Sequence, residues 1–315
     1  MKSRANSARR RFACVCPGAW GLPLLRLDIP DRYAELAPII VTSPTTRCGT
    51  TLVQRLISSS RDAFIYGEEV GLQTRRFGEW LIEVMQHLER NEHSIDADFE
   101  RALAGTLKEW RPGLAPPAHV VLRASLEVFF QFPSALADHG PRIGRPRWGF
   151  KLPALRQDVM QLMLTLMPKA KVVYVVRHPI DALKSAKARR FVVTDEDREE
   201  FCAAWAKNFR DTLELFDRER MFLLCYEGLC DKQADYGSVL EAFTGVHGIS
   251  TREFGNKVNT FRGEAADGCS ASQYIAPQSL SDADEACVTA HAGPLLAKFY
   301  PDGAAFTGDV GSMAA

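Results

Sequence analysis

Short runs of β-branched and aromatic residues alternate along the chain with longer stretches whose apolar residues recur at helical spacing. Beyond Pro30 this alternation is typical of a parallel sheet covered by helices. The runs predicted as strands are Ile39–Thr42, 148–151, Lys171–Val176 and Met221–Cys225. The stretches predicted as helices between them are Thr50–Ser59, 155–167, 180–190 and 195–217. The pattern therefore predicts an α/β fold, a parallel β-sheet flanked by helices, with a right-handed βαβ unit at 148–176.

A long helical segment separates the first two predicted strands. Apolar residues at helical spacing predict a helix over about 70–90. Two further helices are predicted at 95–110 and 119–136, on either side of a proline-rich break at 112–117. We interpret these helices as an insertion over the sheet. Such an insertion can form the substrate-side wall of an α/β enzyme, or it can serve only in packing.

Length and composition favour one folded domain. The 315 residues, of which 46% are hydrophobic, supply enough apolar material for one large core. We predict this domain at 37–302, between a flexible basic leader at 1–36 and a disordered tail at 303–315. The leader resembles a weak signal peptide, but prolines interrupt its apolar stretch. A cytoplasmic location is therefore expected, with export or membrane association through the leader as the alternative.

Charge and cysteine content argue against several other classes of protein. Lys+Arg and Asp+Glu both total 39, so no global field attracts nucleic acid. No hydrophobic stretch reaches the ~18 uninterrupted apolar residues of a membrane span. The cysteines form neither a CxxC pair nor a zinc-ligand spacing, so we expect reduced thiols and predict no metal site. The cysteines are Cys14, Cys16, Cys48, Cys202, Cys225, Cys230, Cys269 and Cys287.

The loop after the first strand has the composition of an anion site. Gly49 lets the backbone approach a phosphate, the next helix begins with free N–H groups, and Arg47 adds a positive charge. The P-loop of nucleoside triphosphatases, GxxxxGK followed by Ser or Thr, differs: here Pro44 occupies its first glycine position and Thr50 its lysine position. The predicted loop is thus P-loop-like but lacks the main γ-phosphate ligand of an ATPase or kinase. An ordinary strand-to-helix turn is the alternative.

A second anion site is predicted after the strand Lys171–Val176. Arg177 follows this strand directly and Ser185 lies in the early turns of the next helix. Ligands of open α/β sheets bind at the carboxyl ends of the strands. There Arg177 can hold a phosphate through two hydrogen bonds while Ser185 donates a hydroxyl. Alternatively, Arg177 and Asp181 contribute only helix-end electrostatics.

These two segments resemble known motifs of one family. The run Arg47-Cys48-Gly49-Thr50-Thr51 resembles the 5′-phosphosulfate loop of sulfotransferases, and Arg177-His178-Pro179 with Asp181 and Ser185 resembles their 3′-phosphate motif. The resemblance implies the sulfotransferase fold. It also implies 3′-phosphoadenosine 5′-phosphosulfate (PAPS) as sulfuryl donor, adenosine 3′,5′-bisphosphate as product and an acceptor that carries a hydroxyl. No metal is implied in the chemistry, because fixed cations take the place of Mg²⁺.

The resemblance also identifies a candidate general base. The small-molecule branch of the family has a His two residues after a Lys, whereas here Lys151-Leu152-Pro153 lacks it. Gly67-Glu68-Glu69 instead resembles the segment of tyrosylprotein sulfotransferases whose second Glu is the base, which implies Glu69. Counted from Arg47, the spacing is one residue longer than in that branch, so Glu68 stays an alternative. Alternatively, neither carboxylate is catalytic, and both only stabilise the N-terminus of a helix.

Further site residues are implied by the same resemblance. Lys151 corresponds to the Lys at the bridging oxygen, Arg189 to a second arginine at the 3′-phosphate and Tyr226 to a tyrosine beside the cofactor. Gly71 stands where tyrosylprotein sulfotransferases have an arginine, which leaves the acceptor open among a tyrosine phenol, a sugar and a small molecule. The C-terminal cofactor loop has three candidates: Ser270, Ser272 and Tyr274. The alternatives are a P-loop phosphotransferase dependent on ATP and Mg²⁺, and a non-catalytic nucleotide-binding module.

Overall fold

The computed structural model describes residues 29–301 except 232 and 256–277. Most of the predicted leader, the predicted tail and the three candidates of the C-terminal cofactor loop lie outside the described residues.

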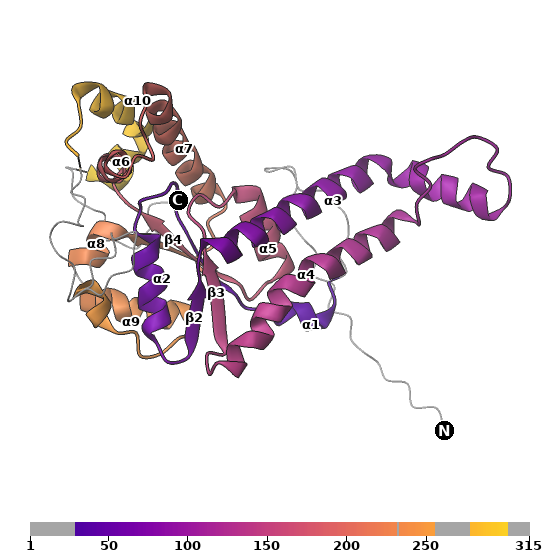
Figure 1. The fold of residues 1–315 in the computed structure, drawn as a ribbon, viewed down its shortest axis with the longest axis horizontal. Coiled ribbons are helices and arrows are strands. Elements are labelled where there is room, and N and C mark those ends of the chain that lie inside the picture. The colour runs from indigo at the N-terminus through magenta and orange to yellow at the C-terminus, as the bar shows by residue number, and fades with distance from the viewer. Residues whose placement is uncertain (1–28, 232, 256–277, 302–315) are drawn as a thin grey trace.

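A five-stranded sheet forms the centre of the fold (Figure 1). All four strand pairs are parallel, and the strand order is β2-β3-β1-β4-β5. The strands are β1 (Ile39–Thr42), β2 (Ala63–Tyr66), β3 (Arg147–Lys151), β4 (Lys171–Val176) and β5 (Met221–Cys225). Four of them match the predicted strands, while β2 was not predicted. The predicted parallel sheet flanked by helices is confirmed.

Helices cover both faces of this sheet. The buried residues form two clusters, one on each face: Ile39 and Val41 belong to one, and Ile40 belongs to the other. This alternation follows from the two-residue period of a strand. The helices packed around the sheet are α2 (Thr50–Ser59), α5 (Gln157–Leu166), α6 (Pro179–Ala188), α7 (Asp195–Glu214), α8 (Tyr226–Asp231), α9 (Gln233–Thr244) and α10 (Asp282–Phe299), with a 3₁₀ turn at Thr251–Gly255.

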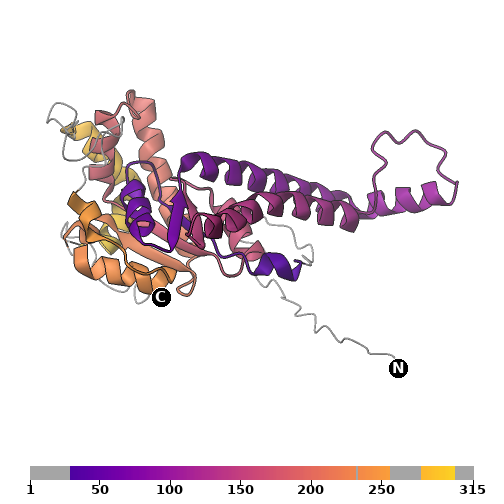
Figure 2. The ribbon, with the colours of Figure 1, turned by 60° about the horizontal axis from the view of Figure 1, so that its bottom comes forward.

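Two long helices extend from the sheet as an arm (Figures 1 and 2). These are α3 (Glu68–Leu103) and α4 (Ala118–Arg142). The prediction of separate helices at 70–90 and 95–110 was wrong, because α3 runs without interruption over 36 residues. The polar residues 91–94 contain neither glycine nor proline, so nothing in the backbone stops the helix there. The helical insertion itself was correctly located.

Helix α4 is long and apolar enough, by length and composition, to cross a membrane. No such segment was predicted from the sequence, because Arg123 and Glu127 interrupt the apolar run of this helix. In the structure Phe129 and Phe130 on α4 are fully buried in the core shared with α3.

The folded body begins before residue 37. A short helix, α1 (Asp31–Ala34), precedes β1. Tyr33 of this helix stacks on Phe130 with ring centroids 4.1 Å apart, and Leu36 is also buried. The described end of the predicted leader is therefore part of the domain rather than a free segment.

Candidate functional site

The loop between β1 and α2 approaches its neighbours closely at Gly49. Gly49 has a φ of 98°, and a Cβ built there would lie 2.1 Å from the Tyr226 ring. Both the left-handed backbone and the contact with Tyr226 therefore require glycine. The backbone N–H of Leu52 donates to the Gly49 carbonyl, so the N–H groups before Leu52 are those that a helix start offers to an anion.

The side chains of this loop have different environments. Cys48 is fully buried, and its Sγ lies 3.6 Å from Thr45 Oγ1. Burial raises the pKa of the Cys48 thiol, so this residue can offer an anion only its backbone N–H. Thr50 is also buried, whereas Thr51 uses its Oγ1 to accept a hydrogen bond from Lys151 Nζ at 3.3 Å.

Three arginines converge on this loop. Arg47 Nε donates to Ser185 Oγ at 3.1 Å, which joins the two anion sites predicted from the sequence. Arg177 donates to the Arg47 carbonyl at 3.2 Å and stands 4.7 Å from the centre of the Tyr226 ring. Burial lowers the pKa of Arg47, and the positive charges of Arg189 and Arg177 lower it further. Several positive charges close together in a half-buried site favour binding of a multiply charged anion.

Lys151 brings a second group of side chains together beside the loop. Its ammonium is buried and forms an ion pair with Glu68, the first residue of α3. Glu69 is exposed, and its carboxylate accepts a hydrogen bond from Gln73 at 3.3 Å. Of the two candidate bases, Glu68 is thus the one that contacts Lys151.

The comparison with known protein families agrees with this geometry. Residues 38–247, two thirds of the chain, match the sulfotransferase family. The chain belongs to the sulfotransferase family. It is therefore a sulfotransferase enzyme, as the two anion motifs implied.

Several solved structures are similar to this sulfotransferase. A sulfotransferase domain from the Synechococcus PCC 7002 olefin synthase is 18% identical, with 84% of this chain and 97% of that chain covered and a TM-score of 0.45. The sulfotransferase of Alicyclobacillus acidocaldarius is 16% identical, with 83% and 93% covered and a TM-score of 0.43. Retinol dehydratase, solved with androsterone and the inactive cofactor PAP, is 17% identical, with 72% and 64% covered and a TM-score of 0.35. No curated protein matches.

Position 71 lies where helix α3 approaches the end of β3 closely. A Cβ at Gly71 would lie 2.7 Å from Leu152 Cβ and 2.9 Å from the Lys151 carbonyl oxygen. Helix α3 therefore approaches the end of β3 so closely that no arginine fits at position 71.

The sequence analysis did not identify the residues that position the site of this sulfotransferase. Trp205 Nε1 donates to the Arg177 carbonyl at 3.2 Å, and Asn208 Nδ2 donates to the Pro44 carbonyl at 2.7 Å. Glu227 accepts the backbone N–H of His178 at 2.8 Å. These contacts fix the ends of β1 and β4. Trp205 lies in the stretch 195–217, which was predicted only as a helix, and no local pattern indicates its partner.

Acid should weaken the start of α6, where His178 is the N-cap. The His178 ring accepts the N–H of Ile180 at 3.3 Å, which requires an unprotonated nitrogen. Burial lowers the pKa of His178. The negative charges of Asp181 and Glu227 raise this pKa, and the positive charge of Lys184 lowers it. A folded-state pKa below the unfolded value of about 6.5 means that this stability is present above pH 6.5 and is lost as pH falls through the folded pKa.

We expect the wild type to lose up to about 1 kcal/mol of stability from this cap between pH 8 and pH 5. The variant His178→Asn keeps an N-cap acceptor that cannot be protonated, so it should lose less over the same range. Urea unfolding followed by circular dichroism at both pH values measures the difference. Equal losses in the two proteins would contradict the assignment.

Proposed function

We propose that this sulfotransferase transfers the sulfuryl group of PAPS to an acceptor hydroxyl and releases adenosine 3′,5′-bisphosphate. The observation that carries the proposal is the joining of the two anion motifs: Arg47 from the first bonds Ser185 from the second. Arg177 bonds the backbone of Arg47 as well. Two motifs 130 residues apart thus form one positively charged site, as a donor with phosphate groups at both ends requires.

The residues present fit such a donor. The loop Arg47–Thr51 would hold the 5′-phosphosulfate through backbone N–H groups and the Arg47 guanidinium. Arg177, Ser185 and Arg189 would hold the 3′-phosphate, and the Tyr226 ring makes a cation–π contact with the Arg177 guanidinium. PAPS supplies the activated sulfuryl group, while the protein supplies position and charge.

We propose Glu68 as the general base, and Lys151 as the cation that stabilises negative charge on the leaving phosphate. Lys151 holds Glu68 and Thr51 together, so the carboxylate lies beside the loop assigned to the phosphosulfate. Arg47, on which the negative charge of Glu68 also acts, adds a second positive charge beside this carboxylate. Fixed charges of this kind need no reorganisation as charge develops, which is why they accelerate transfer. Glu69, which the family resemblance implied, bonds Gln73 instead.

The acceptor in this proposal is a hydroxyl of a tyrosine, a sugar or a small molecule. Gly71 removes the arginine that an acidic peptide would use, which favours a sugar or a small molecule over a protein tyrosine. Glu68 could act as the base for any of these acceptors, since it needs only to reach the proton of the hydroxyl.

Calorimetric titration with adenosine 3′,5′-bisphosphate tests the donor site. We expect binding that does not depend on Mg²⁺, and a loss of roughly 10- to 150-fold in affinity in Arg177→Ala, since a hydrogen bond to a charged group contributes about 1.5–3 kcal/mol. The matched control is Arg210→Ala, because Arg210 is an exposed arginine on α7.

Three outcomes would contradict the proposal. Equal affinity in wild type and Arg177→Ala would remove the 3′-phosphate site. Tighter binding of ATP with Mg²⁺ would favour a phosphotransferase on the same loop. Binding without sulfuryl transfer to any of a panel of phenols, sugars and tyrosine peptides would instead indicate a non-catalytic module.

A further inference from the structure

Four side chains with metal-ligating atoms meet between α7 and α10. Glu199 and Cys202 lie three residues apart on α7, and Cys287 and His291 lie four apart on α10. Each spacing places both residues on one helix face. None of the four belongs to the anion site described above.

The ligand atoms of this group are close to one another. Those of Glu199, Cys287 and His291 all lie within 4.8 Å, and His291 Nε2 is 2.8 Å from Glu199 Oε2. Cys202 is a buried cysteine on α7, and its thiol interacts with the Cys287 thiol beside this group of three ligand atoms. Ligands around a tetrahedral zinc ion are separated by roughly 3.3–3.8 Å, given bond lengths of about 2.0–2.3 Å. The ligand atoms of Glu199, Cys287 and His291 are thus already near these separations, and the Cys202 thiol must rotate toward them to complete the site.

We propose that Glu199, Cys202, Cys287 and His291 bind a zinc ion that fastens α10 to α7. Two thiolates, an imidazole and a carboxylate are ligands that zinc takes, and four protein ligands without an open position are typical of a structural site. Both cysteines are buried, whereas the side chains of His291 and Glu199 are 33% and 56% exposed. A metal ion can thus enter from the solvent side and meet the thiols within.

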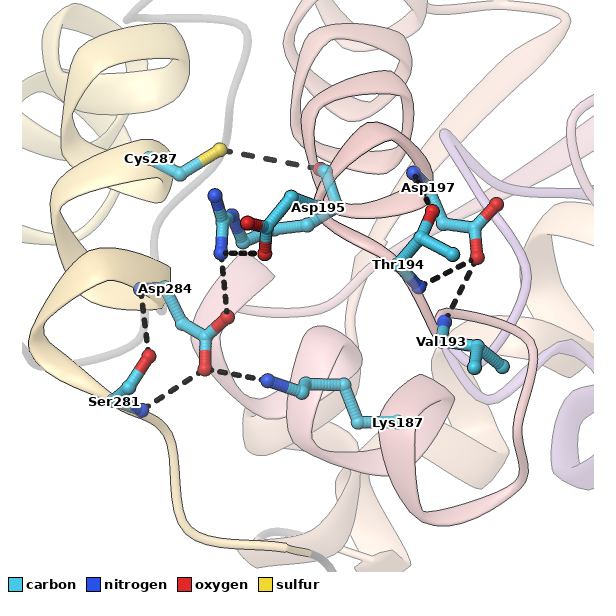
Figure 3. Close-up of polar contacts among 9 residues, drawn as sticks. Lys187, Val193, Thr194, Asp195, Asp197, Ser281, Asp284 and Cys287 are labelled. Atoms are coloured by element: carbon cyan, nitrogen blue, oxygen red, sulfur yellow. Dashed lines mark hydrogen bonds and ion pairs between the residues drawn. The ribbon is translucent and has the colours of Figure 1, made fainter.

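Charge around the group is consistent with a bound zinc ion. Zinc with two thiolates, one carboxylate and a neutral imidazole leaves a net charge of about −1. The positive charge of Arg198 acts on both Glu199 and Cys202, which opposes that excess. In addition, the Cys287 thiol points toward the Arg198 carbonyl at 3.9 Å. Figure 3 shows Cys287 on α10 directed toward α7.

Binding has a defined proton balance. Cysteine binds zinc as its thiolate, whereas an ordinary cysteine thiol, with a pKa of about 8.5, is protonated at neutral pH. Each zinc ion that binds must displace both thiol protons into solvent. Affinity should therefore rise as pH rises.

The position of this group gives zinc a structural role for the whole enzyme. Helix α10 ends at Phe299, which packs against Phe209 of α7 with ring centroids 5.0 Å apart. The next residue, Tyr300, donates to Glu227 at 3.5 Å, and Glu227 also fixes the backbone of His178 at the predicted 3′-phosphate motif. Holding α10 in place thus supports the loop that carries Arg177.

Metal titration of the purified full chain, reduced and freed of metal, tests the proposal. With Zn²⁺ we expect one ion per chain and release of about two protons. With Co²⁺ we expect the absorption bands of a tetrahedral site with thiolate ligands. Cys287→Ser and His291→Ala should each weaken Zn²⁺ binding at least about 100-fold, since even outer partners of ligands are worth 10–100-fold.

Two controls separate this result from binding elsewhere or from misfolding. Cys230→Ser and His87→Ala remove the same side chains away from α7 and α10 and should leave Zn²⁺ affinity unchanged. His291 is partly exposed, so His291→Ala should keep the far-UV circular dichroism spectrum of the wild type. Absence of a thiolate band with Co²⁺, or unchanged zinc affinity in Cys287→Ser, would overturn the proposal. A disulfide between Cys202 and Cys287 in the protein as purified would overturn it too.

Discussion

Glu68→Gln is expected to lower turnover by about 10²- to 10⁴-fold, the usual contribution of a general base, while binding of adenosine 3′,5′-bisphosphate is retained. Glutamine keeps the size of the side chain and can still accept a hydrogen bond from Lys151, but it cannot take the acceptor proton. Sulfuryl transfer from labelled PAPS to a panel of phenols, sugars and tyrosine peptides measures turnover. Calorimetry on the same protein measures the affinity for adenosine 3′,5′-bisphosphate.

Glu69→Gln is the matched control, because it makes the same change one position along α3. Glu69 bonds Gln73 and does not contact Lys151 in the described structure, so its loss should leave turnover nearly unchanged. The opposite pattern, a loss in Glu69→Gln and none in Glu68→Gln, would restore the assignment that the family resemblance implied. Loss of adenosine 3′,5′-bisphosphate binding in Glu68→Gln would show that the residue shapes the donor site rather than the proton transfer.

The sheet could be predicted to the extent that its strands are buried on both faces. Lys171–Val176 and Met221–Cys225 were predicted with their observed bounds, since a nearly continuous apolar run is typical of a strand in a parallel sheet covered by helices. Strand β2 was missed because its run of four apolar residues, Ala63–Tyr66, is too short for periodicity to distinguish a strand from another element. Pairing with β3 places it in the sheet, and that contact is not encoded locally.

The two anion motifs could be predicted because each is a short run with its own backbone context. The choice between Glu68 and Glu69 could not, because it depends on which residue at the start of α3 faces Lys151, and adjacent helix positions differ by about 100°. The group of possible metal ligands between α7 and α10 could not be predicted from the sequence either. Its halves, Glu199 with Cys202 and Cys287 with His291, lie more than 80 residues apart and form no zinc spacing in the sequence.

Asp284 shows how α10 is anchored to the helices beside the donor site (Figure 3). Its carboxylate is fully buried at the start of α10, where it forms a capping box with Ser281. Lys187 at the end of α6 lies 2.6 Å from one oxygen, and Arg198 on α7 lies 3.6 Å from the other. One carboxylate thus joins three helices, and α6 is the helix that carries Ser185.

Asp284→Ala is therefore expected to destabilise the fold by about 3 kcal/mol. This is the lower end of the range for breaking a buried ion pair, because Lys187 keeps 27% of its side chain exposed and can recover some hydration. Urea unfolding followed by circular dichroism measures the change. Asp282→Ala is the control, since Asp282 is an exposed acid in the same first turn and should change stability by no more than about 0.5 kcal/mol. Equal losses in the two variants would mean that Asp284 acts only through the charge it places at the N-terminus of α10, so its contacts with Lys187 and Arg198 would not hold the helices together.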